Sequence, residues 1–384
     1  MMLPGDPSDR VAVGCRHVKP EPLVPDFDDR CIANLLQSLA APSTASGALN
    51  DLRGAVAGAR CVVLLIVDGL GALQLAERSS IAPTLSASLL EPITSVAPST
   101  TAAALTSIST GVAPGRHGLV GYRMEVDGEI LQSLRWTVAG ADASSRIAPE
   151  RIQRVSPLLS RGGRPVPYVG RSSFASSAFT KAHLRGSRYV GADDDEAVVA
   201  SVARESAAEP FVLAYHDAVD KTAHVDGLGE RFDAEVARAD GLVASLREAL
   251  PADVAIVVTA DHGQVDVGSA SATLSHTAMA LVDHMSGEGR FRWLHAHPGE
   301  AGRLAERAHD ELDESCWVFS RRQLLSAGIF GEVDDEVADR LGDVALVPFA
   351  PLFVPDPAEP HEVQMKGRHG SLTEAEMMVP LAVC

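Results

Sequence analysis

The chain has 384 residues, of which 46% are hydrophobic and 22% are charged. This composition is typical of a soluble globular protein and excludes disordered, collagen-like and coiled-coil chains. The formal net charge of −18 excludes a general attraction for polyanions, so we expect no nucleic-acid polymer as a partner. A small phosphate-containing substrate stays compatible with this charge, because bound cations can hold it.

The cysteines and the N-terminal stretch predict the compartment. The cysteines are odd in number and form no C-x-x-C pair, which is typical of reduced thiols in a cytoplasm; they are Cys15, Cys31, Cys61, Cys316 and Cys384. Residues 1–25 carry charges and prolines where a signal peptide has an apolar run, and no segment offers about 18 consecutive apolar residues. We therefore expect a cytoplasmic protein with no membrane partner, and a leader that is loosely held or lies across the surface.

Three continuous apolar runs predict strands that are buried on both faces. They begin at Cys61, Phe211 and Val254, and each ends abruptly in Asp or His residues. Stretches at 195–207 and 229–250 have apolar residues three and four apart, which predicts helices. This alternation indicates an α/β fold with a mostly parallel central sheet and helices on both faces. Because ligands bind outside the carboxyl ends of such strands, the polar strand ends are candidates for one site.

The pattern changes after Asp266. Residues 291–298 and 316–320 read as strands, and residues 300–312 and 321–330 read as helices. We interpret the segment at about 276–340 as a small inserted α+β subdomain.

Two strand ends carry carboxylates that can bind a cation. Asp68 precedes Gly69 directly after the first buried strand, and Asp261 and His262 follow the third. An isolated Asp at such a place is also common as a turn or helix N-cap residue. Position alone leaves both interpretations open.

Asp220 and His224 follow the second strand at a spacing of four residues. If this segment is helical, both side chains lie on one face and can share a metal ion. Asp217 and His216 are nearby competitors, for which we expect a solvated or structural role.

His369 lies next to Gly370, ahead of a helix start that Ser371 or Thr373 could cap. The alternative is a loop histidine that packs on this helix. Carboxylate and imidazole ligands together suit zinc, with manganese or iron as other possibilities.

A run of small and hydroxyl residues extends from Pro98 to Gly111. It predicts the N-terminus of a helix, capped by Ser99 or Thr100 and packed closely on the sheet. A hydroxyl there faces backbone N–H groups and the positive end of the helix dipole, where a phosphate also binds well.

The motifs in this order resemble the alkaline phosphatase superfamily, and within it the type I phosphodiesterase and nucleotide pyrophosphatase family. They are V-D-G, S-T-T…S-T-G…P-x-x-H-G, Y…D-x-x-x-H-x-x-G, T-A-D-H-G and H-G-S-L, and the resemblance spans about Val62 to Leu381. It implies an alkaline-phosphatase-like catalytic domain at 56–384, which contains the inserted cap subdomain at about 276–340. Residues 1–55 would then form the leader and the first helix.

The resemblance also implies the site residues. In that family the nucleophilic threonine lies ten residues before the glycine of the T-G pair, and counting back from Gly111 selects Thr101. Two divalent metal ions would lie beside it. One would be held by Asp220, His224 and His369, and the other by Asp68, Asp261, His262 and the Thr101 oxygen.

Two positions depart from the family pattern. Ala223 stands where relatives often have glycine. Tyr122 stands where nucleotide pyrophosphatases usually have an asparagine that binds a phosphoryl oxygen. Because a phenol can also donate a hydrogen bond, although from a longer arm, we expect Tyr122 to contact the substrate.

The function that the resemblance implies is a phosphodiesterase or nucleotide pyrophosphatase that acts through a phospho-threonine. A phosphomonoesterase or phosphonate hydrolase on the same scaffold would keep every ligand and differ in its pocket, for example at Tyr122 and Arg123. A phosphosugar mutase would favour a serine nucleophile and manganese. A non-catalytic descendant should have lost ligands, and none is missing.

Overall fold

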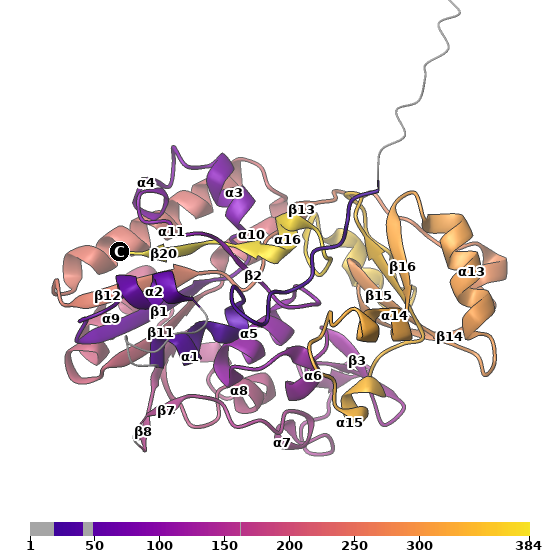
Figure 1. The fold of residues 1–384 in the computed structure, drawn as a ribbon, viewed down its shortest axis with the longest axis horizontal. Coiled ribbons are helices and arrows are strands. Elements are labelled where there is room, and N and C mark those ends of the chain that lie inside the picture. Colours follow the sequence, from indigo (N-terminus) through magenta and orange to yellow (C-terminus); the bar gives the residue numbers. More distant parts are fainter. Residues whose placement is uncertain (1–18, 41–48, 162) are drawn as a thin grey trace, which may run out of the picture.

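The computed structural model describes residues 19–40, 49–161 and 163–384. In these residues the centre of the fold is a six-stranded sheet in the order β10-β9-β11-β1-β12-β20 (Figure 1). Only β20, at one edge, is antiparallel to its neighbour. The strands are β1 (Cys61–Val67), β9 (Pro167–Gly170), β10 (Arg188–Gly191), β11 (Phe211–His216), β12 (Val254–Thr259) and β20 (Leu381–Val383). The predicted α/β class is therefore confirmed, with the three predicted strands as adjacent central members.

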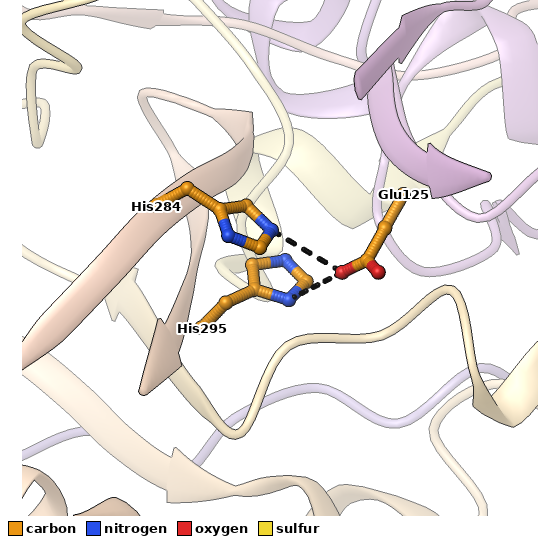
Figure 2. Close-up of side chains that lie close together, drawn as sticks. All are labelled: Glu125, His284 and His295. Carbon is orange, nitrogen blue, oxygen red and sulfur yellow. Dashed lines mark hydrogen bonds and ion pairs between the residues drawn. The ribbon is translucent and has the colours of Figure 1, made fainter. Parts of the chain in front are cut away.

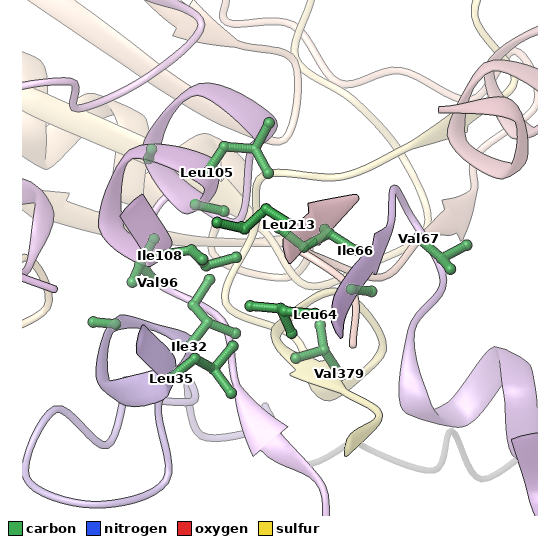
Figure 3. Packing of buried hydrophobic residues seen from close by; sticks show 14 of the residues in the cluster. Ile32, Leu35, Leu64, Ile66, Val67, Val96, Leu105, Ile108, Leu213 and Val379 are labelled. Atoms are coloured by element: carbon green, nitrogen blue, oxygen red, sulfur yellow. The ribbon is translucent and has the colours of Figure 1, made fainter. Parts of the chain in front are cut away.

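Helices cover the sheet on both faces. On one face, α9 (Asp195–Ala208) packs against β1, β9 and β11 and against α11 (Glu230–Ala249). On the other, α5 (Thr101–Thr110) packs against η1 (Ile32–Asn34) and α1 (Leu35–Ala40). Figure 3 shows residues of these last three helices gathered around Leu64, Ile66 and Leu213. Successive strand residues point to opposite faces, so an uninterrupted apolar run such as 61–67 is needed to fill both layers.

A second sheet, in the order β14-β15-β17-β16, lies beside the main sheet. Its strands are β14 (Val282–Glu288), β15 (Phe291–Ala296), β16 (Cys316–Ser320) and β17 (Val344–Pro348), and α13 (Ala301–Leu312) and α14 (Arg321–Ser326) pack with them. The strands and helices predicted between residues 291 and 330 are confirmed here, whereas β14 and β17 were not predicted. The boundaries of an inserted subdomain at about 276–340 stay a prediction.

A small third sheet runs from β3 (Arg123–Val126) through β4 (Glu129–Gln132) and β5 (Thr137–Val138) to β6 (Ala141–Asp142). Strand β3 contacts β14 of the second sheet. The remaining short strands form pairs: β2 (Ile93–Thr94) with β19 (Met378–Val379), β7 (Ser160–Arg161) with β8 (Arg164–Pro165), and β13 (Val265–Asp266) with β18 (Gly367–Arg368).

The remaining helices are short apart from one that follows β11. That helix is α10 (Ala218–Asp226), and it packs against α11 and β18. The others are α2 (Asn50–Ala55), α3 (Ala72–Glu77), α4 (Pro83–Ser86), α6 (Pro114–His117), α7 (Pro149–Ile152), η2 (Ser172–Phe174), α8 (Ala178–His183), α12 (His276–Met279), α15 (Asp335–Ala338), η3 (Pro360–Gln364) and α16 (Glu374–Met377). Among the described helices, none is long and apolar enough to cross a membrane.

The described part of the N-terminal leader lies across the surface. The Pro20 carbonyl accepts a hydrogen bond from Trp317 Nε1 at 2.8 Å, and Leu23 N donates to the Leu372 carbonyl at 2.9 Å. Residues 1–18 of the predicted leader lie outside the described residues, as does Cys15. The four cysteines within the described ranges are free thiols.

Candidate functional site

Three polar turns meet at the carboxyl ends of β11, β1 and β12. In the sheet register Val67 lies beside His216 and Ile66 beside Thr259, so the residues that follow these strands emerge at the same edge. Backbone hydrogen bonds join the turns. Asp68 N donates to the His216 carbonyl at 2.9 Å, and Asp220 N donates to the Asp68 carbonyl at 3.0 Å.

Gly69 explains why V-D-G occurs at this edge. Its φ is +74°, in the left-handed region that favours glycine. A Cβ at this position would also lie 2.8 Å from Gln264 Nε2 and 2.9 Å from Asp220 Cβ. Only glycine therefore allows α10 to come this close to the end of β1.

Asp68, Asp261 and His262 form the first group of possible metal ligands, which we call the inner group. His262 Nε2 lies 3.4 Å from Asp68 Oδ1 and 3.6 Å from Asp261 Oδ2. All three side chains are buried. Within the part of the chain that the structure describes, neither carboxylate oxygen has a hydrogen-bond partner. Since buried polar atoms are nearly always paired, these two oxygens fit an ion.

The two carboxylates of the inner group repel each other. Burial, followed by the neighbouring charges of Asp261 and Asp220, raises the pKa of Asp68 well above its ordinary value. Burial also raises the pKa of Asp261. The Tyr215 hydroxyl donates to Asp68 Oδ2, and Gly69 N donates to Asp261 Oδ1 at 3.1 Å. These donors orient the carboxylates without neutralising them.

Asp220, His224 and His369 form the second group, which we call the outer group. Asp220 Oδ2 lies 3.3 Å from His224 Nε2, and Asp220 Oδ1 lies 3.7 Å from His369 Nε2. Asp220 and His224 share one face of α10, as their spacing predicted. The two groups touch, because the rings of His262 and His369 stack with centroids 3.6 Å apart.

The outer group compensates its own charge. Burial alone would raise the pKa of Asp220, but His224 and the neighbouring rings of His369 and His262 together lower this pKa. The converse holds for His224, whose pKa is raised by Asp220 against the effect of burial. Burial and the charge of His262 hold the pKa of His369 well below its ordinary value.

All three histidines are oriented in the same way. In each ring, Nδ1 lies within hydrogen-bond distance of a backbone carbonyl: Gly263 at 3.0 Å for His262, Gly367 at 2.7 Å for His224 and Ser99 at 2.9 Å for His369. A carbonyl only accepts, so in the neutral rings Nδ1 carries the hydrogen and Nε2 presents its lone pair. Such a carbonyl contact is the usual second partner of a metal-binding histidine.

Thr101 lies where the two groups meet. Its Oγ1 is 3.2 Å from His262 Nε2, and the residue is the first of α5. The first i to i−4 hydrogen bond of this helix is donated by Ala104 to the Thr100 carbonyl, so the amides of residues 101–103 precede it. The predicted side-chain cap is wrong: the Thr100 hydroxyl donates to Glu288 Oε2 and the Ser99 hydroxyl donates to the Ser371 carbonyl.

The side-chain cap predicted at the start of α16 is also absent. Thr373 is the N-cap residue of α16 by position, but its hydroxyl donates to the Glu376 carboxylate instead of capping the helix, so the cap predicted there is also wrong.

The two residues that competed with Asp220 as possible ligands have other partners. Asp217 pairs with Arg171 at 2.6 Å, and His216 lies 3.4 Å from Asp195.

Two cavities open on either side of Thr101. The larger, of about 550 Å³, is lined by Tyr122, Glu288, Arg135, Arg368 and the outer group, among others. The smaller, of about 240 Å³, is rich in aromatic side chains and is lined by Tyr168, Phe174, Phe179, Tyr189 and Tyr215 together with Asp68. Thr101, Leu134 and Asp220 line both cavities.

Tyr122 and Glu288 form part of one wall of the larger cavity. Glu288 Oε2 accepts from Tyr122 N at 3.2 Å and from Thr100 Oγ1 at 3.0 Å. Arg123, which the sequence suggested as a second specificity residue, instead forms a buried ion pair with Asp356.

Three neighbours of the ligands were not assigned a role from the sequence. Tyr215 belongs to a motif that carries the resemblance, and Gln264 follows His262 by two residues and donates to Asp220 Oδ1. Either could have been suspected from its spacing. Glu288 carries no local signal, because it comes from the second sheet and meets Thr100 only through the fold.

Comparisons with known proteins are consistent with this site. A family model described as type I phosphodiesterase / nucleotide pyrophosphatase matches residues 62–372. A comparison with curated protein sequences gives no match. The structure is similar to that of murine ectonucleotide pyrophosphatase / phosphodiesterase 5, solved as an inactive variant in complex with AMP, with a TM-score of 0.59, 15% identity and coverage of 84% of this chain and 87% of that chain. The human protein gives a TM-score of 0.60, 14% identity and the same coverage. At these identities the likeness shows the fold alone.

Proposed function

Because the chain belongs to the type I phosphodiesterase / nucleotide pyrophosphatase family and is a hydrolase of phosphoric esters, we propose that it cleaves a small phosphodiester through a phospho-threonine. The nucleophile is Thr101, and two divalent cations, zinc by preference, would be held beside it by the two ligand groups. The observation that carries the proposal is the position of Thr101 Oγ1, 3.2 Å from His262 Nε2 at the start of α5 and between the two ligand groups.

The residues of the two groups fit two cations. The inner group contributes two carboxylates and one imidazole, and the outer group contributes one carboxylate and two imidazoles. The unpartnered oxygens of Asp68 and Asp261 and the lone pairs on the three Nε2 atoms are the donors that zinc takes in proteins. Manganese and iron accept similar ligands.

The chemistry divides between the cations and the chain. When bound, the cations would lower the pKa of the Thr101 hydroxyl, neutralise phosphate oxygens and stabilise the leaving oxygen. Thr101 Oγ forms a bond to phosphorus as the bond to one ester oxygen breaks, and that oxygen leaves as an alcohol after it takes up a proton. A water molecule then displaces Thr101 from phosphorus and releases a phosphomonoester. The amides at the N-terminus of α5, beside Thr101, would donate to the phosphoryl oxygens.

Two substituents on phosphorus match the two cavities. A diester would place one group among the polar residues of the larger cavity and the other against the aromatic side chains of the smaller one. A phosphomonoester or a phosphonate remains the second candidate, since Tyr122 departs from the asparagine of nucleotide pyrophosphatases. A monoester would leave one cavity without a ligand group, which is why we place the diester first.

Substrate preference tests the first part of the proposal. We expect the zinc-supplemented protein to hydrolyse bis(p-nitrophenyl) phosphate with a kcat/KM at least about ten-fold above that for p-nitrophenyl phosphate, a difference of about 1.4 kcal/mol in transition-state binding. Chelation should abolish turnover and zinc should restore it. Faster cleavage of the monoester would identify the protein as a phosphomonoesterase instead. Full turnover in protein that elemental analysis shows to be metal-free would refute the need for cations.

Substitution of Thr101 tests the nucleophile. Thr101→Ala should remove turnover and keep most of the bound zinc, because the hydroxyl is one ligand among several. Thr110→Ala is the matched control, since Thr110 is buried in the same helix and its hydroxyl donates to the Thr106 carbonyl. Parental turnover in Thr101→Ala would exclude Thr101 as the nucleophile.

A further inference from the structure

A third group of possible metal ligands lies outside the site described above. It consists of Glu125, His284 and His295 and is drawn in Figure 2. His284 in β14 and His295 in β15 are directly opposite each other in the antiparallel register, while Glu125 comes from β3 of the third sheet. The group therefore joins two sheets whose strands are about 160 residues apart in sequence.

The three side chains converge on one point. Glu125 Oε2 lies 3.2 Å from His284 Nε2 and 2.9 Å from His295 Nδ1, as the dashed lines in Figure 2 mark. The two rings stack with their centroids 4.1 Å apart and their planes at 15°. Metal bonds of about 2.1 Å at tetrahedral or octahedral angles place neighbouring ligand atoms about 3.0–3.4 Å apart. Both distances to Glu125 Oε2 are close to this range, and all three ligand atoms lie within 4.8 Å of one another, so the group can hold an ion.

Both rings also have outer partners. His284 Nδ1 lies 2.9 Å from Asp283 Oδ2, and His295 Nε2 lies 2.8 Å from Ser286 Oγ. The register of β14 shifts between Val282 and His284, which is the bulge that brings Asp283 beside the ring of its neighbour. A carboxylate that fixes the outer nitrogen of a histidine is typical of metal sites.

These partners leave two acceptors face to face. A carboxylate only accepts, so Asp283 assigns the hydrogen of the neutral His284 ring to Nδ1 and leaves a lone pair on Nε2. That lone pair points at the Glu125 carboxylate, which is also an acceptor. Either a proton on Nε2, which makes the ring an imidazolium, or a metal cation between the two atoms removes the conflict.

The group is also open to the solvent on one side. The side chains of His284 and Glu125 are 35% and 25% exposed, whereas that of His295 is 8% exposed. An ion can therefore enter from the surface, and water can occupy the coordination positions that the three side chains leave.

We propose that Glu125, His284 and His295 bind a divalent transition-metal ion that fastens the second sheet to β3. Two imidazoles and one carboxylate are a donor set that zinc and iron(II) take in proteins. The ion would act at a distance from the reaction, because β14 continues from His284 to Glu288, about 13 Å further along at about 3.3 Å per residue. There Glu288 accepts from Tyr122 N, and Tyr122 directly precedes β3, so β14 and β3 both lead from the proposed ion to the cavity wall.

The alternative is a histidine and carboxylate cluster that holds the sheets together without a metal. Crystals of the full chain equilibrated with zinc and measured on both sides of the zinc absorption edge separate the two. The proposal requires an anomalous difference peak within bonding distance of all three side chains. The absence of a peak at this position would overturn it, whatever zinc is found beside Thr101.

Metal content gives an independent readout in solution. The double variant His284→Gln/His295→Gln should hold one equivalent of zinc less than the parent protein after equilibration and desalting. His276→Gln/His309→Gln is the matched control, since both histidines are exposed in the same region and lie outside the group. Equal zinc in the parent and the first double variant would refute the site. Because neither variant touches the residues around Thr101, this result is separate from the outcome for the proposed function.

Discussion

The inner and outer ligand groups lie side by side and differ in composition, burial and charge. The inner group has two carboxylates and one imidazole, all of them buried. The outer group has one carboxylate and two imidazoles and lines the larger cavity. The contrast appears in the pKa values: those of Asp68 and Asp261 are raised, whereas that of Asp220 is lowered.

This difference indicates which group depends more on a cation. Buried like charges cost free energy unless an opposite charge accompanies them. The outer group supplies that charge itself, because Asp220 lies against His224, whose pKa is raised by this contact. The inner group has two carboxylates and one imidazole, so its own members do not balance its negative charge. A bound cation would balance this charge, and without the cation the buried charge would destabilise the folded protein.

Removal of one carboxylate from each group should give unequal losses of turnover. Asp261→Asn keeps the shape of the side chain and removes its charge, and we expect turnover to fall roughly 10³-fold, because a bound cation contributes several kcal/mol to the transition state. Asp220→Asn should cost less, on the order of 10²-fold, since two imidazoles remain in its group. Steady-state kinetics with zinc in excess measure both. A larger loss from Asp220→Asn would reverse the ranking of the two groups.

Tyr215→Phe tests the orientation of the inner group. The variant removes the hydroxyl that donates to Asp68 Oδ2 and leaves the ring in place. We expect zinc affinity to fall about ten-fold, as is usual when an outer partner of a metal ligand is lost. Tyr189→Phe is the control, because that hydroxyl donates to the Arg171 carbonyl. Equal zinc affinity in both variants would show that the Tyr215 hydroxyl does not orient the inner group.

Stability of the metal-free protein should change in opposite directions in the two groups. The pKa of Asp261 is raised by folding, so its carboxylate destabilises the fold once pH exceeds the ordinary value of about 3.9. Asp261→Asn should therefore raise the free energy of unfolding at pH 7, with a gain that shrinks towards pH 4. The pKa of Asp220 is lowered, so its contribution is stabilising above pH 4 and Asp220→Asn should lower the free energy of unfolding.

Urea unfolding in the presence of a chelator at pH 7 and at pH 4.5 measures both effects. The explanation from burial and charge fails if Asp261→Asn destabilises the metal-free protein as much as Asp220→Asn does.

Much of the fold could be predicted because its signals are local. The buried strands that begin at Cys61, Phe211 and Val254 are uninterrupted apolar runs, and parallel strands bring their ends to one edge. That rule alone placed Asp68 and Asp261 together. The choice of Thr101 over its hydroxyl neighbours came from the family resemblance, and its role as nucleophile stays a prediction.

The parts that were not predicted depend on contacts between distant segments. Strand β14 has no clear alternation of its own and is ordered by its neighbours in the second sheet, whereas β17 is a short buried apolar run whose local signal could have predicted it. The caps expected from Ser99 and Thr100 failed because tertiary acceptors, Ser371 and Glu288, compete for the same hydroxyls. The pairing of Glu125 with His284 has the same origin.

The central claim is that Thr101 forms a covalent bond to phosphorus, and the stereochemical course of the reaction tests it most directly. A phosphodiester made chiral at phosphorus with sulfur and labelled oxygen would be hydrolysed, and the configuration of the product would be determined. Attack by Thr101 followed by attack of water inverts the configuration at phosphorus twice, so we expect overall retention of configuration. Overall inversion would mean that water attacks the substrate directly, and it would contradict the phospho-threonine.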